Sequence, residues 1–334
     1  MEVTCHLPVV DRSQISGARQ RATAAAEGAG FDETDAHRAG IVATELASNL
    51  VKHATQGGEM LVRSRAGDAP EVEILALDAG PGMGDVARSL ADGYSTSGSS
   101  GTGLGAVRRM ADDFDIYSQA GAGTAIVVRL RRAGSGRPAS SAFEVGGVSA
   151  PMPGESVCGD AWVSTNDRGR VTVGVVDGLG HGVYAAQAAE AATRALMSRP
   201  YDTPLEGLQS MHEAVRHTRG AAATVTMLDV RSAVLNVAGV GNVSVAVVGH
   251  GTVRQAVSLG GILGHQVRQF RQYQYPWEAG NLLVMHSDGL LSRWSLDGYP
   301  GLRQHQPVTI AAVLYRDFRR GKDDVTVVVG KEAA

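Results

Sequence analysis

Four aspartates in the second half of the chain stand where apolar, β-like segments begin or end. They are Asp160, Asp177, Asp288 and Asp323. Apolar strands of this kind assemble into a sandwich, and acids at their ends converge on one rim. Carboxylates that lie this close together repel one another unless cations sit between them. The pattern therefore predicts a site for divalent metal ions.

Each Asp-Gly pair taken alone, such as Asp177-Gly178, is more often a turn than a metal site. Four acids in order, each beside a strand, favour the metal site instead. Two divalent ions about 3.5–4 Å apart can lower the pKa of a bound water from roughly 16 toward about 7 and clamp a phosphoryl group for in-line attack. The carbonyl oxygen of Gly178 is a further candidate ligand. The predicted chemistry is hydrolysis at a phosphoryl group.

Three side chains next to these acids have to be weighed separately. His181 could donate a proton to a leaving seryl oxygen, or it could cap the following helix or pack beside the metals. His286 is expected in the core or at the surface rather than as a ligand. Cys158 has no second soft ligand near it in the sequence, so it is not expected to bind metal.

In the first half of the chain, the first candidate functional residues lie in a helical pattern over residues 33–54, with Asp32 as the expected N-cap. Glu45, Asn49 and Lys52 follow at three- and four-residue spacing, so they share one stripe of that helix. A carboxylate, an amide oxygen and a cation in one row suit Mg²⁺ and a phosphate. The alternative is a polar helix face with one i,i+4 pair.

A predicted strand over residues 72–77 ends in Asp78, and Gly80 and Gly82 follow it. A carboxylate here can accept a hydrogen bond from a base amino group while the glycine backbone lies close to the ring. The competing interpretation is a Rossmann site. The spacing argues against it, because the glycines recur at every second position and a helix precedes the strand.

Residues 93–105 form a segment rich in glycine and serine that leads into a predicted helix from about 104. Glycines allow positive φ and present N–H groups to an anion, and a helix start adds its positive dipole end. The segment is either a floppy loop or a mobile lid over nucleotide phosphates.

Composition places these signals in an ordinary globular protein of two domains. The 334 residues are 43% hydrophobic and 19% charged, which lets each half bury a core. A Gly-, Ser- and Pro-rich stretch over residues 133–142 indicates a linker between domains at 1–132 and 143–331. The net charge of −3 gives no reason to expect nucleic acid or membrane as a partner. Two cysteines and no readable signal or membrane span lead us to expect a cytoplasmic protein.

The three segments of the first half, taken in order, resemble the ATP-binding fold of the histidine-kinase, Hsp90 and gyrase superfamily, and most closely its anti-sigma-factor serine kinases of the RsbT type. The resemblance implies a two-layer α/β sandwich that binds ATP and Mg²⁺. It implies Asn49 as a Mg²⁺ ligand, Glu45 as the catalytic base that orients the attacking hydroxyl, and Asp78 on the adenine. The other nucleotide contacts that it implies are Lys52, Gly80, Gly82, Gly101, Thr102, Gly103, Leu104, Gly105 and Thr124.

The second half resembles the SpoIIE-type branch of the type 2C, metal-dependent protein phosphatases. The motifs that carry the resemblance are Gly159-Asp160, Asp177-Gly178-x-Gly-His-Gly, Ser287-Asp288-Gly289 and Asp323-Asp324-x-Thr. It implies an α-β-β-α sandwich, and hence an α+β chain overall, with two Mn²⁺ or Mg²⁺ ions. Asp177 would bridge both ions as the central catalytic ligand. Asp160 and the Gly178 carbonyl would hold one ion, and Asp288 and Asp323 the other. Asp324 stands where relatives often have asparagine.

Together the resemblances imply a serine/threonine phosphoprotein phosphatase fused to a switch-kinase-like domain. The expected partner is a phosphorylated STAS-domain regulator, of the antagonist or stressosome type, in a bacterial partner-switching pathway. The alternative is that the first domain is only a nucleotide-gated docking or regulatory module. A scaffold with degenerate sites is a third hypothesis, which the intact motifs oppose. A homodimer is one form that the chain could take.

Overall fold

The structure is a computed structural model that describes residues 3–55, 57–67, 69–90, 103–135, 141–167 and 169–333. The chain forms two compact units. The first comprises Met1–Ala139 and Ser295–Asp317, and the second comprises Ser140–Trp294 and Phe318–Ala334. The domain bounds expected from the sequence, 1–132 and 143–331, stay a prediction. No helix in the described part of the chain is long and apolar enough to cross a membrane.

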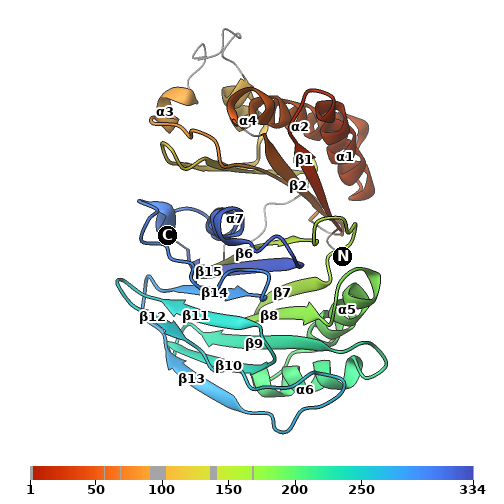
Figure 1. Cartoon of the computed structure of the whole chain (residues 1–334), viewed down its shortest axis with the longest axis vertical. Helices are drawn as coiled ribbons and strands as arrows, with labels where there is room; N and C mark the ends of the chain where they lie inside the picture. Colours follow the sequence, from red (N-terminus) through yellow and green to blue (C-terminus); the bar gives the residue numbers. More distant parts are fainter. Residues whose placement is uncertain are drawn as a thin grey trace. The chain divides into compact units, whose positions relative to one another are not determined.

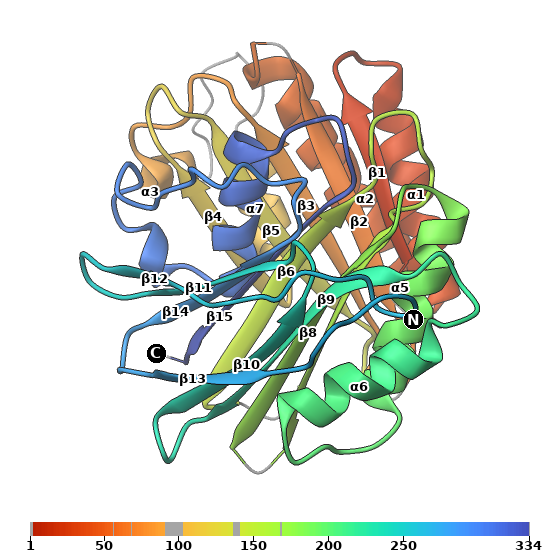
Figure 2. The ribbon, with the colours of Figure 1, turned by 60° about the horizontal axis from the view of Figure 1, so that its bottom comes forward.

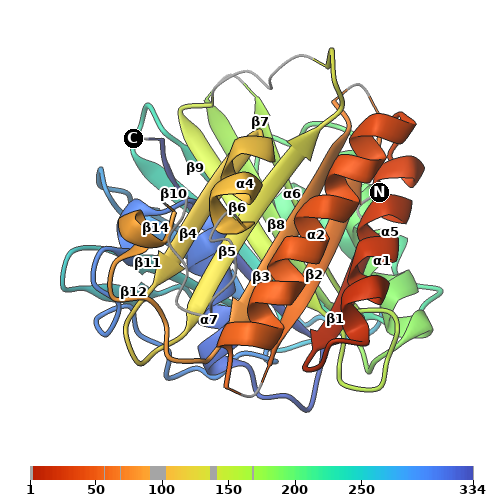
Figure 3. The same cartoon turned by 90° about the horizontal axis from the view of Figure 1, so that it is seen from above.

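The first unit is built on one antiparallel, five-stranded sheet in the order β1-β2-β3-β5-β4. Its strands are β1 (Val3–Val9), β2 (Gly58–Arg65), β3 (Glu71–Asp78), β4 (Asp113–Ser118) and β5 (Thr124–Arg131). Its helices include α1 (Gln14–Gly28), α2 (Glu33–His53), the short α3 (Val86–Ser89) and α4 (Gly103–Met110). Figure 3 shows α1, α2 and α4 lying side by side over the sheet.

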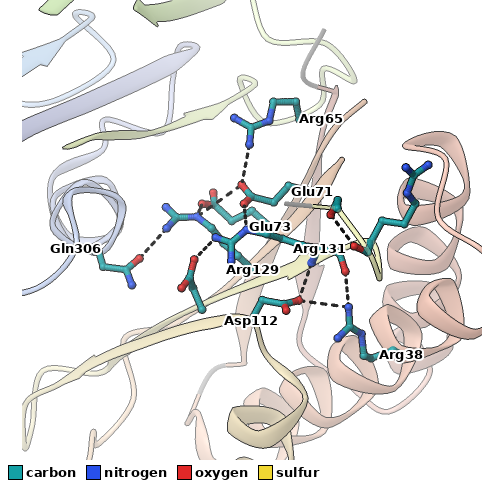
Figure 4. Close-up of polar contacts among 11 residues, drawn as sticks. Arg38, Arg65, Glu71, Glu73, Asp112, Arg129, Arg131 and Gln306 are labelled. Carbon is teal, nitrogen blue, oxygen red and sulfur yellow. Dashed lines mark hydrogen bonds and ion pairs between the residues drawn. The ribbon is translucent and has the colours of Figure 1, made fainter. Parts of the chain in front are cut away.

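Alternation along the strands of this sheet separates its two faces. Met60, Val62 and Ile74 belong to the apolar core shared with the helices, because residues two apart point to the same side. The opposite face carries a buried ion-pair row in which Glu73 contacts both Arg63 and Arg129 across neighbouring strands. Figure 4 shows Glu73 and Arg129 in this row. The sheet therefore buries apolar residues on one side and paired charges on the other.

Residues 295–317, far along the sequence, belong to the first unit and make hydrogen bonds with this sheet. They contain the 3₁₀ helix η1 (Leu302–Gln304) and nearly all of α7 (Pro307–Phe318). Asp115 of β4 accepts hydrogen bonds from the Gln306 amide at 2.9 Å and the Thr309 hydroxyl at 2.7 Å, and pairs with His305 at 2.8 Å. Burial raises the pKa of Asp115, but these hydrogen bonds outweigh it and hold the pKa below its usual value.

The second unit is a sandwich of two antiparallel, five-stranded sheets, in the orders β13-β10-β9-β8-β7 and β12-β11-β14-β15-β6 (Figures 1 and 2). The strands of the first sheet are β7 (Asp160–Asp167), β8 (Arg170–Gly178), β9 (Ala221–Asp229), β10 (Val234–Val240) and β13 (Gln272–Pro276). Those of the second are β6 (Phe143–Ala150), β11 (Ser244–Val248), β12 (Val253–Gln255), β14 (Leu282–His286) and β15 (Val325–Glu332).

Two layers of apolar side chains hold this sandwich together. Val173, Leu235 and Met285 are among the residues that fill the space between the two sheets. A second cluster packs helices α5 (Val183–Met197) and α6 (Pro204–Ala214) on the outer face of the β7–β10 sheet. The predicted α+β fold class is confirmed.

The predicted N-cap of α2 is also confirmed, and it gives a stability test. The Asp32 carboxylate accepts a hydrogen bond from the Asp35 amide at 2.8 Å. We expect Asp32→Ala to lower the free energy of unfolding of the first unit by about 1 kcal/mol, because an amide at the helix start loses its partner. Ser13→Ala is the control, since Ser13 is the N-cap residue of α1 but makes no capping hydrogen bond. Urea unfolding followed by circular dichroism measures both, and an equal effect of the two substitutions would contradict the assignment.

Candidate metal centre and nucleotide site

The second unit brings the predicted acids to the same region from two strand pairs. Strands β7 and β8 pair in a register that sets Asp160 directly opposite Asp177. Asp288 follows β14 and Asp323 precedes β15, and these two strands are neighbours in the other sheet. The pKa of Asp177 is raised to about 7, first by burial and then by the negative charges of Asp288, Asp323 and Asp324. The acids therefore lie within electrostatic reach of one another.

Asp160 is the most buried of these acids, with 6% of its surface exposed. Its Oδ2 atom is buried and has no hydrogen-bond partner in the described part of the chain. Burial and then the charge of Asp177 raise the pKa of Asp160 well above its usual value. An unpartnered carboxylate oxygen in the interior is costly, and a cation removes that cost. The donor set fits a hard divalent ion.

The side chains are not arranged around an ion in this conformation. Among the described residues, no group of three or more His, Cys, Asp and Glu side chains is placed to hold a metal. Asp288 instead accepts a hydrogen bond from the Asn242 amide at 2.7 Å. Ion binding therefore requires some of these carboxylate side chains to rotate.

Asp324 has a positioning role that sequence reasoning missed. Its two carboxylate oxygens accept hydrogen bonds from the amides of Met152, at 2.8 Å, and Gly159, at 2.9 Å. Asp324 thereby fixes the loop that leads into Asp160. The sequence showed Asp324 only as a departure from the asparagine that relatives often have, and gave no sign that it anchors a loop.

Glycines are required where the two loops of this site meet. The Gly178 amide donates to the Gly159 carbonyl at 3.1 Å. A Cβ on Gly159 would lie 2.6 Å from Asp324 Oδ2, and one on Gly178 would lie 2.2 Å from the Ala185 carbonyl oxygen. Any side chain at these positions would push apart the loops that carry Asp160 and Asp177.

The residues weighed beside the acids take different roles. His181 is half-exposed and pairs through Nδ1 with Glu155 at 2.7 Å, and the N-cap of α5 is Gly182, so the capping interpretation of His181 was wrong. His286 is a core residue, as expected: Trp294 donates to its Nε2, which leaves the proton on Nδ1 for the Ser287 carbonyl. Burial lowers the pKa of His286, so it is neutral.

Cys158 donates to the Ala150 carbonyl at 3.4 Å. Burial raises the pKa of its thiol well above the usual value, which keeps it protonated. A protonated thiol is a poor metal ligand. The expectation that Cys158 does not bind metal is consistent with this environment.

In the first unit, the predicted nucleotide residues gather at the ends of β3 and β5. Asp78 ends β3 directly opposite Thr124, the first residue of β5. The Asp78 carboxylate accepts from the Gly80 amide at 2.8 Å, and burial raises the pKa of Asp78. A Cβ on Gly82 would lie 2.0 Å from the Gln119 carbonyl oxygen, so the turn requires glycine there.

The predicted nucleotide-site residues that are helical lie on two helices, α2 and α4. Glu45 and Asn49 are half-buried on α2, and Lys52 is exposed one turn further on. A Cβ on Gly103, the first residue of α4, would lie 2.8 Å from Glu45 Oε2, so the two helices meet at this carboxylate. Leu104 and Gly105 are buried in α4. Gly101 and Thr102 lie outside the described residues.

Sequence reasoning did not foresee one neighbour of Asp78. Arg316 of α7 donates to the Asp78 backbone carbonyl at 3.2 Å, across 238 residues of sequence. Its side chain is almost fully buried and also pairs with Asp317. No local pattern at either position indicates this contact.

Two known families match the chain, one in each half, in the order that the sequence motifs predicted. Residues 9–130 match the histidine kinase-like ATPase domain family. Residues 167–331 match the family of stage II sporulation protein E, SpoIIE.

Individual relatives support both matches. The serine/threonine-protein kinase RsbT of Bacillus subtilis (strain 168) is 37% identical over 112 residues, which cover 34% of this chain and 84% of RsbT. The phosphoserine phosphatase RsbX of the same organism is 24% identical over 187 residues, 53% of this chain and 89% of RsbX. A crystal structure of RsbX in complex with magnesium has a TM-score of 0.50 at 20% identity, over 58% of this chain and 97% of RsbX.

A solved structure from work on the bacterial stressosome, as a modular system adapted to control secondary messenger signalling, is also similar. It has a TM-score of 0.53 at 29% identity, over 57% of this chain and all of that one. The chain is therefore a fusion of a histidine kinase-like ATPase domain of the RsbT family with a metal-dependent phosphatase domain of the SpoIIE family.

Proposed function

We propose that the second unit removes phosphate from phosphoserine or phosphothreonine of a protein, with two Mn²⁺ or Mg²⁺ ions as cofactors. The observation that carries the proposal is the convergence of Asp160, Asp177, Asp288 and Asp323 on one region, where the pKa of Asp177 is raised to about 7. A group of buried and half-buried acids that repel one another fits divalent ions better than any other ligand.

The ions, when bound, supply an acidified water and positive charge for the phosphoryl oxygens. The chain contributes the oxygens that hold them. Asp177 would serve both ions, Asp160 and the Gly178 carbonyl one, and Asp288 and Asp323 the other. Asp324 keeps the Asp160 loop in place through the Met152 and Gly159 amides. Loss of an orienting partner of this kind typically costs 10- to 100-fold in metal affinity or activity.

For the first unit, the proposal is that it binds ATP and Mg²⁺ and phosphorylates a serine or threonine of the partner. Asp78 would accept a hydrogen bond from the adenine, Asn49 would bind Mg²⁺, and Glu45 would orient the attacking hydroxyl. The proximity of Glu45 to the start of α4 supports this arrangement, because helix starts favour phosphate. The kinase activity named for RsbT supports it as well.

A second candidate function for the first unit is nucleotide-dependent regulation without phosphate transfer. Arg316 contacts the backbone of Asp78, the proposed adenine residue. Its helix lies in the chain between Asp288 and Asp323, two of the proposed metal ligands. A nucleotide that moved Asp78 would therefore also move Arg316 and its helix α7, which the chain connects to Asp288 on one side and to Asp323 on the other.

The partner that we propose is a phosphorylated STAS-domain regulator of a stressosome or partner-switching pathway in the cytoplasm. The names of the relatives support this choice. A kinase and a phosphatase on one chain would act on the same serine of the partner, because the linker raises the effective concentration of each active site near the substrate of the other.

Asp177→Asn tests the metal centre. We expect the release of phosphate from p-nitrophenyl phosphate and from a phosphoserine peptide, in millimolar Mn²⁺, to fall by more than about 100-fold, since loss of an outer-shell partner alone costs up to about 100-fold. Asp202→Asn is the matched control, because Asp202 is an exposed acid just before α6. Wild-type rates in Asp177→Asn would overturn the assignment.

The raised pKa of Asp177 predicts how pH affects the metal-free protein. The pKa is about 7 when folded and about 3.9 when unfolded, so the protonated carboxyl stabilises the fold at low pH, and this contribution is lost as pH rises through 7. We expect the stability of Asp177→Asn relative to wild type to increase by at least about 1 kcal/mol between pH 5 and pH 8, because the wild-type contribution is lost over this range. Thermal unfolding in EDTA measures this difference.

Added Mn²⁺ provides the second arm of that experiment. At pH 8 it should raise the melting temperature of the wild-type protein and leave that of Asp177→Asn nearly unchanged, because binding to the folded state alone stabilises it. Identical pH profiles for the two proteins, or an equal response to Mn²⁺, would show that Asp177 is not part of an ion site.

Phosphate transfer separates the two candidate functions of the first unit. In the Asp177→Asn background, which preserves any phosphate that is attached, we expect label from [γ-³²P]ATP on a STAS-domain partner. Glu45→Gln should abolish the label and keep ATP binding, because this carboxylate orients the hydroxyl and not the nucleotide. ATP binding without any labelled partner would leave regulation as the function of this unit.

A further inference from the structure

Exposed apolar side chains gather beside the acids of the second unit. Among the described residues, nine large apolar side chains are exposed, and three of them follow Gly178 within six positions: Leu179 at 47%, Val183 at 57% and Tyr184 at 62%. Val157, at 39%, precedes Gly159 on the other loop. Four of the nine therefore lie on the two loops that carry Asp160 and Asp177, and exposed apolar side chains gathered at one place are typical of a binding surface.

The two loops that carry these side chains are neighbours. The Gly178 amide donates to the Gly159 carbonyl at 3.1 Å. Further out, Glu155 pairs with His181, and a Cβ on Gly182 would lie 3.1 Å from the Glu155 carboxylate. We call Val157, Leu179, Val183 and Tyr184 the apolar rim.

Arg219 adds a positive charge to the apolar rim. Its guanidinium carbon lies 4.8 Å from the centre of the Tyr184 ring, and Arg219 Nη1 would be 3.2 Å from a Cβ on Gly180. The adjacent Gly220 carbonyl accepts a hydrogen bond from the Leu179 amide at 3.0 Å, which ties the base of Arg219 to the same loop. Arg219 is therefore held over the segment that follows Asp177.

The environment of Arg219 differs from that of Arg194 and Arg216, two other arginines nearby in the sequence. Arg194 pairs with Glu190 at 2.6 Å and Arg216 with Glu213 at 2.7 Å. Arg219 is exposed and forms no ion pair with a carboxylate in the described part of the chain. A guanidinium that is stacked on an aromatic ring and lacks an acidic partner can bind an incoming phosphate or carboxylate with its planar fork.

We propose that the apolar rim and Arg219 form the docking surface for the phosphoserine-bearing segment of the protein substrate. The inference rests on the proposed phosphatase function and specifies how its substrate is selected. Apolar side chains next to the phosphoserine pack on the rim, while Arg219 attracts the negative charge of the phosphorylated segment. A small phosphate ester reaches the acids without contacting either.

Selection at this surface should appear in KM for peptides and not in the chemistry. The probes are p-nitrophenyl phosphate and two synthetic phosphoserine peptides, one with leucines and one with glycines beside the phosphoserine. For Tyr184→Ala and Arg219→Ala we expect KM for the leucine-flanked peptide to rise roughly 10-fold, the effect of a central contact residue at an interface. Hydrolysis of p-nitrophenyl phosphate in Mn²⁺ should stay within about 2-fold of wild type.

Matched variants separate docking from folding. Tyr184→Phe retains the ring and should keep the wild-type KM. Met197→Ala removes an exposed apolar side chain at the other end of α5, and Arg194→Ala removes an arginine of the same helix, so neither should change KM for the peptide.

Each result bears on one claim. Unchanged KM for the leucine-flanked peptide in both Tyr184→Ala and Arg219→Ala would overturn the docking surface. A loss of p-nitrophenyl phosphate hydrolysis equal to the loss of peptide hydrolysis would also overturn it, because these residues would then support the metal centre instead. A wild-type protein that is inert toward all three probes would overturn the proposed phosphatase function itself.

Discussion

Repulsion between buried and half-buried carboxylates is the constraint around which the second unit is organised. The register of β7 and β8 sets Asp160 opposite Asp177, and the loops after β14 and before β15 bring more acids within electrostatic reach. Such a cluster destabilises a fold unless protons or cations neutralise it. The raised pKa values of Asp160 and Asp177 mean that protons neutralise part of this charge in the absence of metal ions, which is one solution to the repulsion. Divalent ions are the other solution, and they also provide the proposed chemistry.

Backbone packing keeps that cluster in place. The amides of Met152 and Gly159 bind Asp324, and the absence of side chains at Gly159 and Gly178 lets the two ligand loops touch. The rim and Arg219 follow from the same arrangement, because the loop after Asp177 must run outward into α5 and exposes Leu179, Val183 and Tyr184 as it does so. The proposed metal centre and the proposed docking surface are thus neighbours that share the loop after Asp177.

The first unit depends on a different interaction, the contact of residues 295–317 with the five-stranded sheet of that unit. Asp115 collects three partners from this segment, and Tyr315 donates to Glu59 at 3.0 Å. These groups are buried or nearly so, which makes the contacts costly to leave unsatisfied. The segment is continuous in the chain with the stretches that carry Asp288 and Asp323. Phosphate transfer and nucleotide regulation both remain compatible with this architecture.

Much of this could be predicted from local patterns in the sequence. Apolar runs located the strands, Asp32 marked the start of α2, and aspartates beside strand ends marked the acids of the proposed metal centre, because these signals depend on residues only a few positions apart. Tertiary structure alone decided which groups meet across long sequence distances. It placed Asp324 on the Gly159 amide, Arg316 on the Asp78 carbonyl and Arg219 beside Tyr184. Such pairs have no periodicity to reveal them, since a hydrogen bond or a stacked ring depends on distance in space and leaves no spacing in the chain.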